Sequence, residues 1–199
     1  MVDYGMCNLD SMRRALEECG ANPRVTDNPK ELEQAERIVL PGVGAFGDAM
    51  LNLRERGLDQ ALKGQVAQRV PLLGVCLGMQ LLASTGSEGG ASAGLNLIPG
   101  DVVKLAPTPD TPRIPHVGWN EVTPHREHPL FRGLGMGKDF YFVHSYHFRC
   151  AERGDALAGT PYCGGFTSVV AREHVMGVQF HPEKSQKSGF ALLRNFLGC

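Results

Sequence analysis

The sequence predicts one α/β domain with a central, mostly parallel sheet flanked by helices and extra antiparallel strands in its second half. Short, wholly apolar runs alternate with helical patterns in the first half, and strand-like runs crowd the second half. The 199 residues are 42% hydrophobic, which is enough for one substantial core. No repeat or linker divides the chain, so a single domain is expected over residues 1–199.

The first helix is predicted over residues 9–19, where apolar side chains recur at helical spacing between the N-cap Asn8 and the stop Gly20. Asn28-Pro29 opens a short second helix, because proline is tolerated at the first helical position. Two compact apolar runs follow and predict buried parallel strands, with helices between them over residues 46–56 and 58–68. The two strands are Ile38–Leu40 and Leu72–Val75.

The second half is predicted to be rich in strands and to end in a helix. Two segments are predicted to be loops from their composition: the glycine-rich 86–94 and the proline-rich 107–115. Apolar, β-branched and aromatic runs predict four strands, and a final amphipathic pattern predicts a closing helix. The strands are expected over residues 102–105, 140–148, 168–171 and 175–180, and the helix over 190–197.

Charge and hydropathy exclude several classes of protein. The formal net charge is −1, from 20 Lys+Arg against 21 Asp+Glu, without the basic excess of a nucleic-acid binder. No apolar run approaches the roughly 20 residues that span a bilayer, and the first residues do not resemble a secretory signal. The six cysteines lack C-x-x-C spacing. We therefore expect a cytoplasmic protein with free thiols, and neither nucleic acid nor membrane as a partner.

Cys76 is the cysteine whose neighbours suggest chemistry. It lies in Gly74-Val75-Cys76-Leu77-Gly78, after an apolar strand and before a helical segment over residues 79–83. This is the pattern of a nucleophile elbow with cysteine in place of serine. The turn lifts the sulfur out of the sheet edge, and the helix N-terminus favours its reactive thiolate. A buried cysteine between packing glycines would give the same five residues.

A base for this nucleophile is predicted at His181. In the segment His181-Pro182-Glu183, residues i and i+2 point the same way, so an imidazole and an orienting carboxylate can lie side by side. Pro182 fixes one backbone angle between them. A nucleophile, a base and an orienting group together make a catalytic triad. Alone, the segment would also suit a surface histidine and glutamate at the end of a strand.

The loop over residues 41–47 is the third part of the predicted site. Three of its residues are glycines, which reach backbone angles closed to other residues. Such a loop can aim an N–H at a developing oxyanion, and the amide of Leu77 would be the second donor. In isolation the pattern favours a simple tight turn before a helix over an oxyanion loop.

A metal or cofactor site is not expected. His144 and His147 are three residues apart, which on a strand places them on opposite faces. The sequence has no H-E-x-x-H motif, no phosphate loop and no convincing dinucleotide fingerprint. Catalysis is therefore predicted to need neither a metal nor a cofactor.

With these residues in view, the chain resembles the class I, or triad, glutamine amidotransferases. The likeness rests on the elbow and the late His-Pro-Glu, and it runs from about residue 3 to the C-terminus. Further blocks narrow it to the glutaminase subunits of imidazole glycerol phosphate synthase, in histidine biosynthesis. These blocks are PGVGAFGDAM at 41–50, PHVGWN at 115–120, YFVHSY at 141–146 and HPEKSQ at 181–186.

The resemblance implies a role for each site residue. Cys76 would attack the amide carbon of L-glutamine and form a glutamyl thioester, His181 would move the proton, and Glu183 would orient His181. The backbone amides of Val43 and Leu77 would form the oxyanion hole. Residues that would hold glutamine are Gly44, Gln80, Ser145 and Tyr146.

The resemblance also implies a partner protein. A β/α-barrel cyclase subunit would form a heterodimer with this chain, accept the ammonia, and make imidazole glycerol phosphate and an aminoimidazole carboxamide ribonucleotide. The chain would be a weak glutaminase until that partner is loaded. The residues expected to face the partner are His116, Trp119, Asn120 and Lys184.

Two departures from the family pattern affect the fold. Only Met1-Val2 precede Asp3, so the first strand is either very short or truncated, and its neighbours could be left with unpaired backbone groups. Cys7 stands where the family usually has glycine, and it would be strained if that position needs a positive φ.

Three other functions stay open. A glutaminase of another synthase, of the anthranilate or aminodeoxychorismate type, would lack the 115–120 and 184–186 blocks. A hydrolase acting alone on γ-glutamyl compounds would be fully active without a partner. A non-catalytic binding subunit would have lost a triad residue, but Cys76, His181 and Glu183 are all present.

Overall fold

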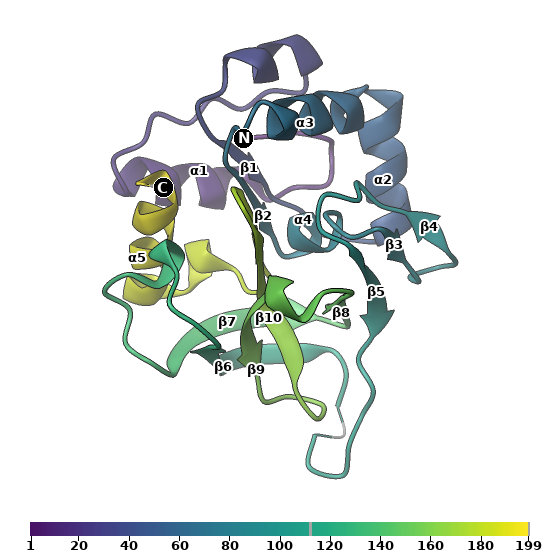
Figure 1. The fold of residues 1–199 in the computed structure, drawn as a ribbon, viewed down its shortest axis with the longest axis vertical. Helices are drawn as coiled ribbons and strands as arrows, with labels where there is room; N and C mark the ends of the chain where they lie inside the picture. The colour runs from purple at the N-terminus through teal and green to yellow at the C-terminus, as the bar shows by residue number, and fades with distance from the viewer. Residues whose placement is uncertain (112, 199) are drawn as a thin grey trace.

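The computed structural model describes residues 1–111 and 113–198, and it shows a curled sheet flanked by helices. Helices of the first half lie at the top of Figure 1, and strands of the second half at the bottom. The predicted α/β class is thereby confirmed. Pro112, in the predicted 107–115 loop, and Cys199 lie outside the described residues.

Three buried parallel strands carry the ends from which the site is built. They are β1 (Ile38–Leu40), β2 (Leu72–Val75) and β11 (Val175–Val178), and both β1 and β11 pair with β2. Every residue of the three strands is buried, which explains their continuous apolar runs. The two strands predicted around residues 38 and 72 are therefore confirmed as parallel neighbours.

The first three residues act as a short additional strand beside β1. The N–H of Val2 donates to the carbonyl of Val39 over 3.0 Å, and Asp3 N–H donates to the carbonyl of Thr26 over 2.8 Å. Thr26 N–H returns a bond to the carbonyl of Met1. The short first strand therefore still pairs on both sides. Cys7 is not one of the residues with positive φ, so the predicted strain there is absent.

The second half adds mostly antiparallel strands. The strand order along the sheet is β1-β2-β11-β10-β8-β5-β3-β4, with β6 joined to β7 and β9. Among these added strands, only β3 and β5 pair in parallel. The bounds are β3 (Thr85–Gly86), β4 (Ser92–Ala93), β5 (Gly100–Lys104), β6 (His116–Pro124), β7 (Lys138–His144), β8 (Tyr146–Cys150), β9 (Ala156–Thr160) and β10 (Phe166–Arg172).

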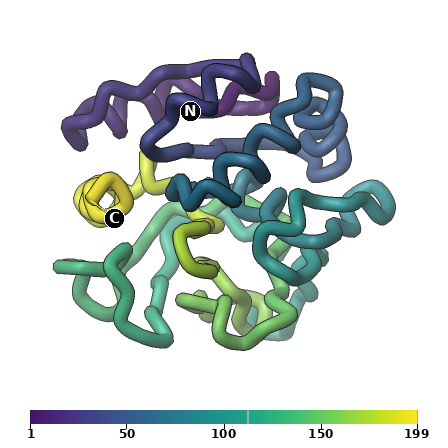
Figure 2. Tube along the Cα trace, turned by 45° about the horizontal axis from the view of Figure 1, so that its top comes forward, coloured from purple at the N-terminus to yellow at the C-terminus, as the bar shows by residue number. Residues whose placement is uncertain are grey.

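The helices are α1 (Leu9–Glu18), α2 (Phe46–Glu55), α3 (Leu58–Ala67), α4 (Leu77–Gln80) and α5 (Gln186–Leu197). The first three match the predicted ones closely, whereas α4 begins and ends before the predicted 79–83 and α5 begins before the predicted 190–197. The C-terminal α5 lies close to the N-terminal α1, and both bury apolar side chains in one core cluster (Figure 2). Phe140 and Phe180 stack in that cluster, with ring centroids 4.0 Å apart.

Several local details differ from the sequence prediction. The side chain of Asn8 makes no capping hydrogen bond to the first helix. The predicted second helix is a 3₁₀ turn, Pro29–Gln34, and the side chain of Asn28 accepts a hydrogen bond from Lys30 N–H at its start. The predicted loop 86–94 contains the small β3–β4 hairpin. The strand predicted over 140–148 breaks at Ser145, because β7 pairs with β6 while β8 pairs with β5. Strands β6 and β9 were not predicted.

Within the described residues, no helix is long and apolar enough to cross a bilayer. In the same part of the chain, no three His, Cys, Asp or Glu side chains gather in a way that could hold a metal ion.

Candidate active site

Cys76 sits in a strained turn between β2 and α4. Its φ of 55° and ψ of −111° lie in a region that costs about 1–3 kcal/mol for a non-glycine residue. Its N–H is held by the carbonyl of Val178 at 2.8 Å. A β-carbon at Gly74 would lie 2.5 Å from the carbonyl oxygen of Gly78, and one at Gly78 would collide with the carbonyl of Leu40. Both glycines are therefore required by the turn, as the elbow pattern predicts.

The sulfur of Cys76 is nearly buried, with the residue 7% exposed. The carbonyl oxygen of Val143 lies 4.0 Å from Sγ, and the side-chain amide nitrogen of Gln179 lies 3.8 Å from it on another side. The helix α4 that follows is only four residues long, so its dipole is small and its first-turn N–H groups provide most of its local effect. The carbonyl of Val143 in β7 and the side-chain amide of Gln179, which follows β11, thus both lie beside the sulfur.

His181 and Glu183 lie directly after β11 and form a buried pair. Nδ1 of His181 is 2.8 Å from Oε1 of Glu183, and the two side chains are 5% and 3% exposed. The backbone N–H of His181 donates to the carbonyl of Tyr141, and the Ser185 hydroxyl donates to the carbonyl of His181. The imidazole and the carboxylate therefore lie side by side as expected, but the backbone is extended only at His181, because Pro182–Lys184 form a 3₁₀ turn.

The environment of His181 favours its charged form. Burial alone would lower its pKa, but interactions with Cys76 and Glu183 outweigh burial and raise the pKa to about 10. Nε2 of His181 is buried and makes no hydrogen bond to a described residue. Since Nδ1 is occupied by Glu183, Nε2 is the nitrogen left to exchange a proton with the sulfur.

The loop over residues 41–47 is not arranged as an oxyanion donor. The N–H of Val43 donates to the carbonyl of Met6 over 2.8 Å, and the Val43 side chain faces solvent. Gly44 follows with a φ of 110°, which a residue with a β-carbon rarely adopts. Val43 can serve as an oxyanion donor only after the bond to Met6 breaks, so that role stays a prediction.

Three of the residues predicted to hold glutamine, Gln80, Ser145 and Tyr146, lie close together. Gln80, in α4, donates one side-chain N–H to the carbonyl of Tyr146 and the other to Oε1 of Gln179, each over 3.0 Å. Ser145 lies between β7 and β8, and its carbonyl accepts a bond from Leu105 N–H. Both side-chain N–H groups of Gln80 are used within the protein, and its role in holding glutamine stays a prediction.

The family model described as Glutamine amidotransferase class-I matches residues 1–198. The chain belongs to the class I glutamine amidotransferase family.

Similar proteins agree with this assignment. The imidazole glycerol phosphate synthase subunit HisH of Moorella thermoacetica is 48% identical over 196 residues, which cover 98% of this chain and 92% of that relative. The subunit of the same name from Salinibacter ruber is 47% identical, again over 98% and 92%.

Solved structures share the fold at lower sequence identity. A crystal structure of a glutamine amidotransferase aligns with a TM-score of 0.78 at 21% identity, covering 99% of this chain and 96% of that one. A glutamine amidotransferase from Thermotoga maritima aligns with a TM-score of 0.71 at 17% identity, covering 98% and 94%.

Three of the predicted partner-facing residues of this amidotransferase lie on β6, and the fourth, Lys184, lies in the 3₁₀ turn Pro182–Lys184. Trp119 is 47% exposed on β6, and Lys184 lies over the Tyr141 ring at 5.8 Å from its centroid. Asn120 is half-buried, whereas His116 is only 3% exposed. His116 is therefore buried beneath this face, and contact of any of the four residues with a partner stays a prediction.

Sequence reasoning missed three residues of this region. Val117 and Val143 face each other across β6 and β7, and both are exposed beside Trp119. The alternation of inward His116 and outward Val117 along β6 is a signal that could have found them. Gln179 precedes His181 by two residues, but its contact with Cys76 joins distant parts of the chain and has no local sequence signal.

Proposed function

We propose that the chain is the glutaminase subunit of an imidazole glycerol phosphate synthase, which hydrolyses L-glutamine to L-glutamate and ammonia. The observation that carries the proposal is the strained Cys76 elbow beside the buried His181–Glu183 pair. Two relatives named as the HisH subunit of imidazole glycerol phosphate synthase are 48% and 47% identical to the chain over nearly their full length. They support this synthase over others that use a glutaminase subunit. A cytoplasmic location stays a prediction.

The proposed reaction begins from a Cys76 thiolate and a protonated His181. The sulfur attacks the amide carbon of glutamine and forms a C–S bond, while the carbonyl oxygen takes the negative charge. His181 gives its Nε2 proton to the leaving nitrogen, the C–N bond breaks, and ammonia departs. Water then attacks the thioester as His181 takes its proton, and glutamate leaves as the thiolate returns. The raised pKa of His181 supports this starting pair.

The oxyanion would be stabilised by backbone N–H groups. Leu77, the residue after the nucleophile, is one proposed donor, and Val43 is the other once it releases Met6. Loss of one such donor costs about 10²–10³ in kcat in other acyl-transfer enzymes. A site with Val43 bound to Met6 should therefore be slow, which agrees with the expectation of a glutaminase that is weak without its partner.

The partner is proposed to be a β/α-barrel cyclase subunit that forms a heterodimer with this chain. The outward side of β6 and β7 supports this interface, because it exposes Val117, Trp119 and Val143 beside the half-buried Asn120. The same hairpin carries the Val143 carbonyl that contacts Cys76, so a protein docked there would lie close to the released ammonia. The cyclase would use that ammonia to form imidazole glycerol phosphate and an aminoimidazole carboxamide ribonucleotide.

The decisive test is glutamate release from glutamine by the purified chain, alone and with the cyclase subunit plus its nucleotide ligand. Weak activity alone and strong stimulation by the loaded partner support the proposal. High activity alone without stimulation would mean a free-standing hydrolase of γ-glutamyl compounds. Stimulation only by an anthranilate or aminodeoxychorismate synthase subunit would assign the chain to that pathway, and no activity in any mixture would mean a binding role.

A further inference from the structure

The side-chain amide of Gln179 faces the nucleophile and has no role in the reaction proposed above. Gln179 is fully buried at the end of β11, and its Nε2 lies 3.8 Å from Sγ of Cys76. Sulfur accepts hydrogen bonds at longer distances than oxygen does, and as a thiolate it is only an acceptor. The contact therefore matters most when Cys76 is ionised.

The orientation of the Gln179 amide is fixed by its neighbour. Nε2 of Gln80 can only donate, so the atom that it meets at 3.0 Å must be the oxygen of Gln179. The NH₂ group of Gln179 is then the end that points to the sulfur. Gln80 is held in turn, because its second N–H donates to the carbonyl of Tyr146.

The same carbonyl of Tyr146 begins a chain of bonds through two histidines. Nδ1 of His144 lies 2.8 Å from the Tyr146 carbonyl, which can only accept, so Nδ1 carries a hydrogen and Nε2 is an acceptor. Nδ1 of His116, 3.0 Å from that Nε2, must therefore donate. Nε2 of His116 then accepts from the side-chain amide of Asn120 over 3.2 Å. Every link has one donor and one acceptor when both rings are neutral.

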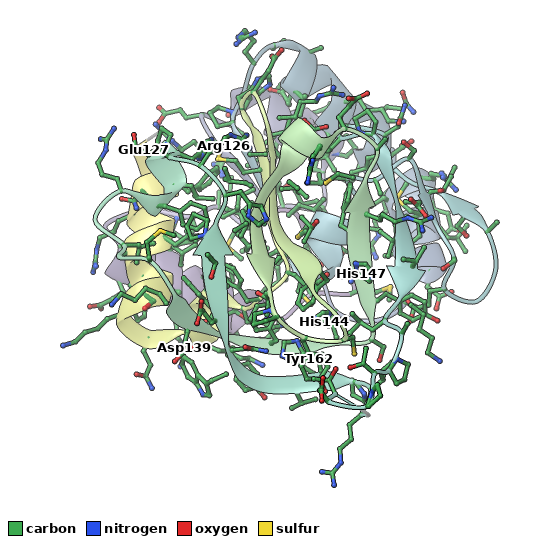
Figure 3. The ribbon with its side chains drawn as sticks, turned by 60° about the horizontal axis from the view of Figure 1, so that its bottom comes forward. Arg126, Glu127, Asp139, His144, His147 and Tyr162 are labelled. Carbon is green, nitrogen blue, oxygen red and sulfur yellow. The ribbon has the colours of Figure 1, made fainter. Side chains whose placement is uncertain are left out.

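Both rings stay neutral at physiological pH. Burial lowers the pKa of His144 to about 3 and that of His116 to about 4. His116 stacks on Tyr162, with ring centroids 3.9 Å apart, and on Phe142 at 4.7 Å. His144 and Tyr162, both labelled in Figure 3, each pack against the ring of His116. The chain from Asn120 to Cys76 is thus a single, fully paired arrangement.

We propose that Gln179 is a further catalytic residue, whose N–H donates to the Cys76 thiolate, and that His144 and His116 are positioning residues acting through Tyr146 and Gln80. The inference rests on the proposed glutaminase function and adds a third group that acts on the sulfur. A hydrogen bond to the charged form of a group favours that form. The same N–H remains beside the sulfur when the thioester is hydrolysed and negative charge returns to it.

The experiment is the pH dependence of Cys76 alkylation by iodoacetamide, measured on the full chain without glutamine or partner. Mass spectrometry of the Cys76 peptide separates this thiol from the other cysteines. Gln179→Met keeps an unbranched side chain but removes the donor, and it is expected to raise the midpoint by about one pH unit. Gln65→Met is the matched control, since Gln65 is buried in α3 away from the site, and its midpoint should equal that of the original chain.

Gln179→Glu is the second variant, because it still accepts from Gln80 while offering no N–H to the sulfur at neutral pH. It should also raise the midpoint, and it replaces Gln179→Met if that variant fails to fold. His144→Phe removes the link to Tyr146 and is expected to give a smaller rise in the same direction. An unchanged midpoint in folded Gln179 variants overturns the catalytic role, and an unchanged midpoint in His144→Phe overturns the positioning role.

The alkylation midpoint reports ionisation of the thiol and not the hydrolysis of glutamine. A chain that never releases glutamate but shows the expected shifts would refute the proposed function and leave the Gln179 contact intact. A chain that is an active glutaminase but shows no shift would refute the Gln179 proposal alone.

Discussion

Nδ1 of His181 and Oε1 of Glu183 lie 2.8 Å apart, in two side chains that are at most 5% exposed. A bond between a buried imidazole and a carboxylate is strong and fixes the ring, because water does not compete for either group. The carboxylate also keeps a hydrogen on Nδ1, which leaves Nε2 for proton exchange with Cys76.

Glu183→Gln is expected to lower kcat for glutamine hydrolysis by about 10²–10⁴, with a smaller effect on KM. The amide has the same shape but can favour the wrong tautomer of His181, and it no longer stabilises the imidazolium. Steady-state glutamate release in the presence of the loaded cyclase subunit measures the effect. An unchanged kcat would remove Glu183 from the mechanism.

Cys76→Ser is expected to abolish glutamate release while binding of the cyclase subunit persists. The serine hydroxyl is far harder to ionise than the thiol, so His181 cannot create a comparable nucleophile. The cyclase reaction supplied with free ammonia should not change in this variant. A large loss of that ammonia-dependent reaction would mean that Cys76 acts through assembly of the complex.

Gly78→Ala is expected to lower the free energy of unfolding by about 3 kcal/mol or more, because its β-carbon would collide with the carbonyl of Leu40. Gly64→Ala is the matched control in α3, where an added β-carbon meets nothing within 4 Å. That change should raise stability by about 0.5–1 kcal/mol through helix propensity. Urea unfolding measures both, and equal effects would contradict the close packing of the elbow.

Stability is expected to fall as the pH drops below 6.5. In the unfolded chain His144 and His116 bind protons near the ordinary pKa of 6.5, whereas in the folded chain they do so only near pH 3 and 4. Between pH 6.5 and the folded pKa values, the unfolded state binds more protons than the folded state. The contribution of the two neutral rings to the free energy of unfolding is therefore fully present above pH 6.5 and is lost toward pH 3. His144→Phe should flatten this part of the profile in thermal melts from pH 7 to 4. A slope equal to that of the unchanged chain would contradict the pKa of His144.

The proposed catalytic groups were predictable because each belongs to a local pattern. The Cys76 elbow needs its two glycines within five residues, and His181 and Glu183 are only two residues apart. Chemistry that depends on such short spacings is visible in one sequence. The parallel strands β1 and β2 were visible for a related reason, since burial on both faces leaves a continuous apolar run.

The missed features depend on contacts between distant parts of the chain. Strand β6 mixes a glycine, a tryptophan and polar residues, and it becomes a strand through pairing with β7 and β9. The link from Gln179 to Cys76 spans 103 positions, and the one from Gln80 to Gln179 spans 99. The resemblance implied that His116 faces the partner, but the pleat of β6 turns it inward.

Trp119 is the one tryptophan of the sequence, and it lies 47% exposed on the outward side of β6, edge-to-face with Tyr141 at 6.1 Å between ring centroids. Indole fluorescence of the chain therefore originates from a single place, and that place is the proposed docking face. An indole moved out of water emits at shorter wavelengths. The protein thus carries its own optical reporter of docking, and a titration with a tryptophan-free partner would need no added dye.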